Sequence, residues 1–137
     1  MFRNRTCRSA NNPSTRPRLT GIRPIWVFLM IRGNEVTAAV RGFLVGFGIE
    51  VPDLKVLASE TDPRVIGHET SNANPEGGVT AVENLLAKDP DMNVVYTINE
   101  PAAVGANAAL QAAGKKAIIV SVDGGCAGVK SVTDGVI

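Results

Sequence analysis

Residues 121–131, with the sequence SVDGGCAGVKS, bring together an acid, a cysteine, a glycine-rich turn and a Lys-Ser pair. Such residues could form a phosphate loop, a reactive thiol or a polar site for a neutral ligand. A Walker phosphate loop requires G-x-x-x-x-G-K-[ST], and here Val129 stands where a glycine must precede Lys130. The carboxylate of Asp123 would also repel a phosphate. The segment therefore favours a neutral ligand over a nucleotide.

A reactive thiol is the second chemistry that this segment suggests. Cys126 lies where a helix is expected to begin, and a helix N-terminus can lower the pKa of a thiol. Nucleophilic catalysis also needs a base within hydrogen-bond reach, and no motif links Cys126 to the chain's single histidine, His68. We interpret Cys126 as a small, partly buried residue and His68 as a solvent-exposed loop residue. With Cys7, Cys126 forms neither a metal-ligand spacing nor a disulfide framework.

Asn99 and Asp123 each follow an apolar run, in the sequences TINEPAA and SVDGG. An amide, a carboxylate and an arginine such as Arg41 supply the mixture of donors and acceptors that a polyhydroxylated neutral ligand needs. The same residues have a purely structural interpretation, because Asn99 could cap the next helix and Asp123 could form an Asx turn. Both interpretations stay open on spacing alone.

Apolar runs alternate with helix-length segments in the part of the chain that must position these residues. Continuous apolar runs are typical of strands buried between two helix layers, and here they occupy residues 25–31, 54–58, 93–98 and 117–122. The periodicity between them predicts helices at residues 35–47, 77–87 and 102–113, and a fourth that starts near Ala127. The pattern predicts an α/β fold with a Rossmann-like parallel sheet and helices on both faces. Ligands of such sheets bind beyond the carboxyl ends of the strands.

Turn-forming residues agree with this division of the chain. Gly48 and Gly114 stand where a left-handed residue would end a helix, and Pro101 stands in a first helical turn. Residues 59–75 are long and polar for a connection, and we interpret them as a functional or insertion loop. Residues 136–137 resemble the start of a fifth strand, so we expect a fold that is truncated there.

Composition bounds the class of protein. A chain of 137 residues suits one compact domain, which we place at residues 25–137, after a disordered basic tail at residues 1–24. The tail holds six arginines and no acid, whereas the remaining residues carry 8 basic and 13 acidic side chains. An acidic body argues against a broad nucleic-acid surface. The longest apolar run, residues 25–31, is too short for a transmembrane helix, which needs about 18 residues, and no signal peptide is visible.

Residues 94–137 resemble the carboxyl-terminal lobe of type I periplasmic sugar-binding proteins, the ribose- and fructose-type substrate-binding components of ABC transporters. The family pattern is a strand, then N-[DE]-x-x-A-x-G-A, a helix that ends in A-G-K, and a strand that ends in D-G. These motifs stand here at residues 99–106, 113–115 and 123–124. The stretches GNEVTAAVRGF and ENLLAKDPDMNVVY extend the resemblance to residues 25–137.

The resemblance implies a site and partners. It implies that Asn99 and Asp123 bind the hydroxyl groups of a small-molecule sugar and that Arg41, on the helix after the first strand, joins them. It implies a non-enzymatic, monomeric protein of the periplasm that serves an inner-membrane ABC permease, with no cofactor, no metal and no nucleic acid. Family members close two lobes around the sugar, and the resemblance covers one lobe. We therefore expect a fragment whose own affinity for sugar is weak or undetectable.

Three other interpretations stay open. The effector-binding half of a lactose-repressor-type regulator shares this fold, although residues 1–24 show no apolar periodicity for a helix-turn-helix. A Rossmann-type enzyme would need G-x-G-x-x-G after the first strand, and the sequence lacks it there. A non-functional remnant of a receptor gene is compatible with the transporter interpretation.

Overall fold

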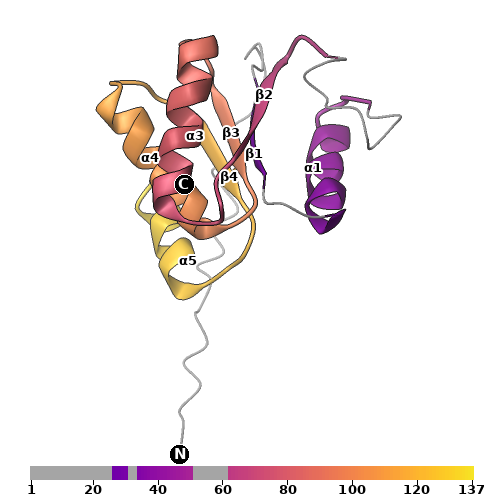
Figure 1. Cartoon of the computed structure of the whole chain (residues 1–137). Helices are drawn as coiled ribbons and strands as arrows, with labels where there is room; N and C mark the ends of the chain where they lie inside the picture. The colour runs from indigo at the N-terminus through magenta and orange to yellow at the C-terminus, as the bar shows by residue number, and fades with distance from the viewer. Residues whose placement is uncertain (1–25, 31–33, 51–61) are drawn as a thin grey trace, which may run out of the picture.

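A computed structural model of the chain describes residues 26–30, 34–50 and 62–137, which form an α/β fold (Figure 1). Its parallel sheet has four strands in the order β2-β1-β3-β4. The described elements are, in chain order, β1 (Trp26–Met30), α1 (Asn34–Gly46), β2 (Val65–Thr70), α3 (Pro75–Lys88), β3 (Val94–Thr97), α4 (Glu100–Ala112), β4 (Ile118–Ser121) and α5 (Cys126–Thr133). The predicted parallel α/β sheet is confirmed.

Strands β3 and β4 run in step. Val94 at the start of β3 lies opposite Ile118, and Thr97 at its end lies opposite Ser121. The loops that follow the two strands therefore leave the same edge of the sheet side by side. This register positions the residues that follow β3 next to those that follow β4.

Helices cover both faces of the sheet, as the sequence predicted (Figure 1). Helices α3 and α4 pack together on one face, and α1 lies on the other. Successive residues of β3 contribute to the two cores in turn, since Val95 belongs to the cluster on the α3 and α4 side and Tyr96 to the cluster on the α1 side. Burial on both faces explains why this strand is apolar throughout.

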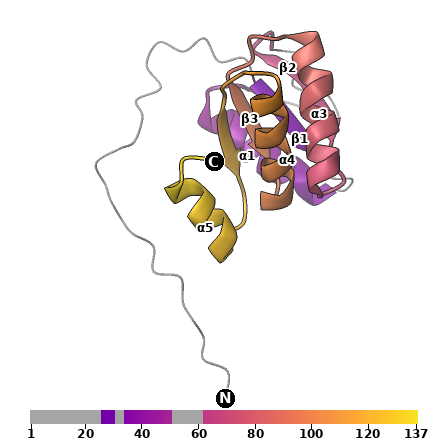
Figure 2. The same ribbon diagram turned by 90° about the vertical axis from the view of Figure 1, so that its left-hand side faces the viewer.

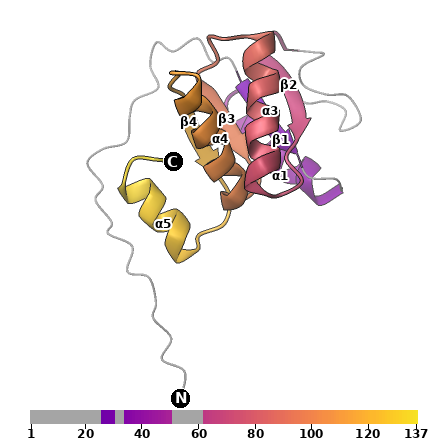
Figure 3. The same ribbon diagram turned by 60° about the vertical axis from the view of Figure 1, so that its left-hand side comes forward.

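Helices α3 and α4 lie side by side, while α5 lies to one side of them (Figures 2 and 3). Two glycines allow the close approach of α3 and α4. A Cβ atom on Gly78 would lie 2.5 Å from the carbonyl oxygen of Ala102, and one on Gly105 would lie 2.0 Å from that of Pro75. This contact fixes the position of α4, at whose first turn the candidate site begins.

The predicted helix ends are largely confirmed. Gly48 and Gly114 have φ of +70° and +64° after α1 and α4, and Pro101 lies in the first turn of α4. The predicted helices begin one or two residues inside the observed α1, α3 and α4. The difference arises because polar and proline residues of a first turn carry no apolar periodicity.

Parts of the chain before α3 differ from the sequence predictions or lie outside the described residues. The strand predicted at residues 54–58 lies outside the described residues, as does the tail at residues 1–24. The loop predicted at residues 59–75 is wrong in part, because it contains β2. Strand β2 is an edge strand of the described sheet. Its polar residues can therefore stay partly exposed, and its sequence lacks the continuous apolar run by which a buried strand is predicted; they are His68, Glu69 and Thr70. His68 is accordingly a half-buried strand residue, not an exposed loop residue.

The fifth strand predicted at residues 136–137 is also wrong, because these residues form no strand. The backbone N–H groups of Val136 and Ile137 donate to the carbonyl oxygen of Ser131, at 2.8 and 3.4 Å. The segment therefore satisfies the carbonyl groups at the end of α5. Ile137 packs against the core on the α3 and α4 side.

Candidate functional site

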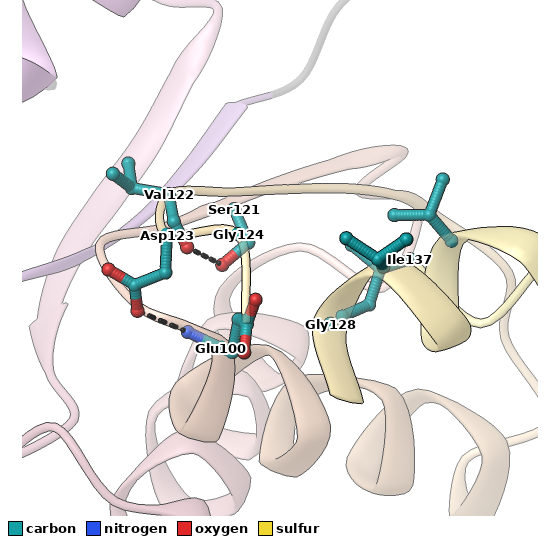
Figure 4. A pocket seen from close by; sticks show the side chains of 9 residues that line it. Glu100, Ser121, Val122, Asp123, Gly124, Gly128 and Ile137 are labelled. Carbon is teal, nitrogen blue, oxygen red and sulfur yellow. Dashed lines mark hydrogen bonds between the residues drawn. The ribbon is translucent and has the colours of Figure 1, made fainter. Parts of the chain in front are cut away.

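The carboxyl ends of β3 and β4 are joined by side-chain hydroxyl groups. The fully buried Thr97 donates to Oγ of Ser121 at 2.9 Å, and Ser121 donates to the carbonyl oxygen of Val122 at 3.1 Å (Figure 4). A buried hydroxyl needs a partner, and here the partners link one strand end to the other. These hydrogen bonds give the candidate site a rigid base.

Asn99 caps α4, as one of its two interpretations predicted. Its Oδ1 accepts the backbone N–H of Ala102 at 3.2 Å, and its Nδ2 donates to the carbonyl oxygen of Ala73 at 3.2 Å. The second bond reaches the loop after β2, so Asn99 connects two of the loops at this edge. An amide oxygen accepts two hydrogen bonds and an amide nitrogen donates two, so each still has capacity for a ligand.

Asp123 reaches back from β4 to the start of α4. Its Oδ2 accepts the backbone N–H of Glu100 at 3.3 Å (Figure 4). The structure thus brings Asp123 next to the residue that follows Asn99, and not into the Asx turn that was its alternative interpretation. The side chain is exposed. Its backbone has φ of +91°, a conformation that costs a non-glycine residue about 1–3 kcal/mol and often marks a functional site.

Arg41 lies apart from this pair. It is an exposed residue of α1, the helix on the face opposite α3 and α4. Within the described residues, no hydrogen bond or ion pair joins Arg41 to Asn99 or Asp123. The structure therefore places Asn99 and Asp123 at the start of α4, without a hydrogen bond between the two side chains, and Arg41 on another helix.

A pocket of about 160 Å³ opens beside Asp123 (Figure 4). Sites that enclose a small molecule measure about 300–1,000 Å³. This pocket is smaller, so it could hold only part of such a molecule. Two carboxylates and no basic side chain line it, which disfavours an anionic ligand. The lining residues are Glu100, Ser121, Val122, Asp123, Gly124, Gly128, Val129, Val132 and Ile137.

A larger pocket, of about 510 Å³, lies at the opposite end of β4, between the end of α4 and residues 135–136. It includes Lys115 and Lys116 and none of the predicted site residues. Ligands of open parallel sheets bind at the carboxyl ends of the strands. The smaller pocket is therefore the better candidate despite its size.

Two parts of the site were missed from the sequence. Ser121 lines the pocket, and the loop after β2 supplies the carbonyl oxygen of Ala73. Asn72 and Ala73 both have positive φ, of 51° and 58°. The sequence SNAN could have revealed a tight turn, since asparagine tolerates this conformation. Nothing in the sequence indicates that this turn meets Asn99.

The remaining residues of the opening segment have structural roles. Cys126 is the first residue of α5, and it is exposed and disulfide-bonded. The expectation of a partly buried cysteine outside any disulfide is therefore wrong. Lys130 forms an ion pair with Asp134 one helical turn later. Ser131 donates to the carbonyl oxygen of Ala127 at 3.1 Å.

Neither a membrane span nor a metal centre is found in the described parts of the chain. No helix described here has the length and apolar character needed to cross a bilayer. Over the same residues, no three histidine, cysteine, aspartate or glutamate side chains gather into a group that could hold a metal ion.

Known proteins are similar to this chain over most of its length. The ribose import binding protein RbsB of Haemophilus influenzae is 33% identical over an alignment of 109 residues, and the alignment covers 78% of this chain and 34% of that protein. RbsB of Bacillus subtilis is 28% identical over an alignment of 119 residues, which covers 76% of this chain and 39% of the relative. A crystal structure of a protein from Mycobacterium smegmatis matches 83% of this chain and 37% of its own, with a TM-score of 0.64 and 23% identity.

The chain thus spans little more than a third of the length of these relatives. A family model described as "Periplasmic binding protein domain" matches residues 27–137, which include every described element but the first residue of β1. The chain belongs to the periplasmic binding protein domain family.

Proposed function

We propose that this chain binds a neutral sugar as part of the substrate-binding component of an ABC transporter, of the ribose or fructose type. The observation that carries the proposal is the hydrogen bond from the backbone N–H of Glu100 to Asp123, which lines the pocket, because it brings Asp123 to the first turn of the helix that Asn99 caps. The relatives named as ribose import binding proteins support the choice of a sugar.

The polar groups at this edge suit hydroxyl groups. The Asp123 carboxylate has a second oxygen to accept from a hydroxyl, and the Asn99 amide can both donate and accept. Each such hydrogen bond contributes about 0.5–1.5 kcal/mol net. Three of them contribute about 1.5–4.5 kcal/mol, and a Kd of about 1 mM corresponds to 4.1 kcal/mol, so we expect a Kd near or above about 1 mM. The lobe on its own is therefore a weak binder.

We also propose that Arg41 supplies a third contact. Helix α1 follows β1, so it begins at the same edge of the sheet as α4 and α5. The planar guanidinium group donates five hydrogen bonds and suits vicinal hydroxyl groups. Arg41 is exposed, which leaves this group accessible to a ligand.

For the whole protein we propose a role without catalysis. It would act in the periplasm as a monomer, require no cofactor, bind no nucleic acid and deliver its sugar to an inner-membrane ABC permease. The names of the relatives as import binding proteins support this role. The acidic lining of the pocket agrees with a neutral ligand.

A titration followed by NMR tests the choice of ligand. D-ribose added to roughly 200 mM is expected to shift the amide signals of Asn99, Glu100 and Asp123 in a saturable way, with a Kd above about 1 mM. Ribose 5-phosphate, the matched control, is expected to bind several-fold more weakly because the two carboxylates repel its phosphate. Equal or tighter binding of the phosphorylated sugar would refute a site for a neutral ligand.

A further inference from the structure

We infer that Glu100 is a positioning residue that holds the loop after β4 in the conformation that presents Asp123 to the sugar. The inference rests on the proposed function. It concerns two hydrogen bonds, which we call the Glu100 clasp. The backbone N–H of Glu100 donates to Oδ2 of Asp123 at 3.3 Å, and Oε1 of Glu100 accepts the backbone N–H of Gly125 at 2.9 Å. Glu100 thus contacts the loop with both its main chain and its side chain, and Figure 4 shows the main-chain bond to Asp123.

The glycines of α5 leave space for the Glu100 side chain. A Cβ atom on Gly128 would lie 1.8 Å from Oε1 of Glu100, and one on Gly125 would lie 3.0 Å from Oε2. Gly128 is buried although it lies on a short exposed helix. The absence of side chains at Gly125 and Gly128 therefore leaves room for the Glu100 carboxylate.

The Glu100 clasp also caps α5 from another element. Gly125, the N-cap residue of α5, has no side chain to accept a hydrogen bond, and the structure shows no side-chain cap there. Glu100 lies in the first turn of α4 as well. Its negative charge is thus close to two helix N-termini, where an anion is favoured.

Asp123 needs such support because of its backbone. Its φ of +91° is one that residues with a side chain rarely adopt. The two hydrogen bonds of the Glu100 clasp lie at residues 123 and 125, on either side of Gly124. Without them the loop would relax toward ordinary φ values, and the carboxylate of Asp123 would leave its place at the first turn of α4.

Substitution of Glu100 tests the inference. Glu100→Ala is expected to lower the hydrogen-exchange protection of the Gly125 amide at least tenfold. It should also change the HN–Hα coupling constant of Asp123, which reports φ, and raise the Kd for D-ribose at least threefold. Glu100→Gln, which keeps the length and one acceptor oxygen, is expected to retain most of the Gly125 protection and the Asp123 coupling.

Glu76→Ala is the matched control, because Glu76 is an exposed residue in the first turn of α3. The variant loses the same favourable charge at a helix N-terminus but no contact with the loop. It is expected to leave Gly125, Asp123 and the ribose affinity unchanged. Gly128→Ala gives an independent route, since its Cβ would displace the carboxylate while Glu100 stays in place, and it should reproduce the effects of Glu100→Ala.

Two results would overturn the inference. One is an unchanged Asp123 coupling and Gly125 protection in both Glu100→Ala and Gly128→Ala. The other is a lost clasp with an unchanged ribose affinity, which would leave the proposed function intact and remove Glu100 from it. A wild-type chain that binds no ribose would instead refute the proposed function. The exchange and coupling measurements would then still decide whether Glu100 positions the loop.

Discussion

Gly105→Ala is expected to destabilise the fold by about 3 kcal/mol, near the top of the usual range for overpacked sites. The new Cβ atom would lie 2.0 Å from the carbonyl oxygen of Pro75 and 2.9 Å from the backbone nitrogen of Val79. Both atoms belong to the backbone of α3, so no side chain can rotate away, and the two helices must separate. The gain in helix propensity, about 1 kcal/mol, offsets only part of this cost. Urea unfolding followed by circular dichroism measures the difference.

Gly42→Ala is the control for this substitution. Gly42 also lies inside a helix, α1, but among the described residues no atom outside its own stretch of helix backbone lies within 4 Å of the position of its Cβ. The same change is therefore expected to stabilise the chain by about 0.5–1 kcal/mol, because alanine loses less backbone entropy. If both variants unfold at the same urea concentration, close packing of α3 on α4 does not stabilise the fold.

Acidification is expected to destabilise the wild-type chain through His68. Burial, with a further contribution from the positive charge of Lys88, lowers the pKa of His68 to about 4 from 6.5. Between these two values the unfolded chain binds a proton that the folded chain does not, so stability falls as the pH falls. The contribution of His68 is complete above pH 6.5 and is lost by pH 4. For a half-buried group we expect a loss of about 2 kcal/mol, below the limit of 1.36 kcal/mol per pKa unit.

The variant His68→Gln isolates this effect, because carboxylates titrate equally in both proteins. Unfolding free energies measured between pH 7 and pH 4 are expected to fall more steeply for the wild type, by about 2 kcal/mol over the range. Parallel curves for the two proteins would mean that His68 titrates normally in the folded state.

The sheet and its helices could be predicted because each buried element has one dominant pattern. Strand β3 is apolar on both faces, and α4 begins at an Asn-Glu-Pro sequence that caps a helix. The edge strand β2 could not be predicted in this way, because half-exposed positions accept His68 and Glu69. The spacing of apolar residues reveals an element only where its side chains are buried, and an edge strand buries fewer side chains than a central one.

The candidate site was predictable to a similar extent. Asn99 and Asp123 follow strands that a parallel sheet must place at one edge. Their contacts depend on three loops that meet only in the fold, as the bonds from Asn99 to Ala73 and from Glu100 to Asp123 show. The contacts of Arg41 could not be predicted, because its position on the helix after the first strand does not determine which residues it contacts in the fold.

The variant Asp123→Gly tests the central claim, that Asp123 is part of a sugar site, most directly. Glycine adopts a φ of +91° without strain, so the variant is expected to be at least as stable as the wild type and yet to lose the carboxylate. Ribose should then shift residues 99–100 and 121–125 of the wild-type chain in a saturable way, and should shift none of them in the variant. Equal ribose affinity in the two proteins, or shifts centred on Lys115 and Lys116 at the opposite end of the sheet, would contradict the claim.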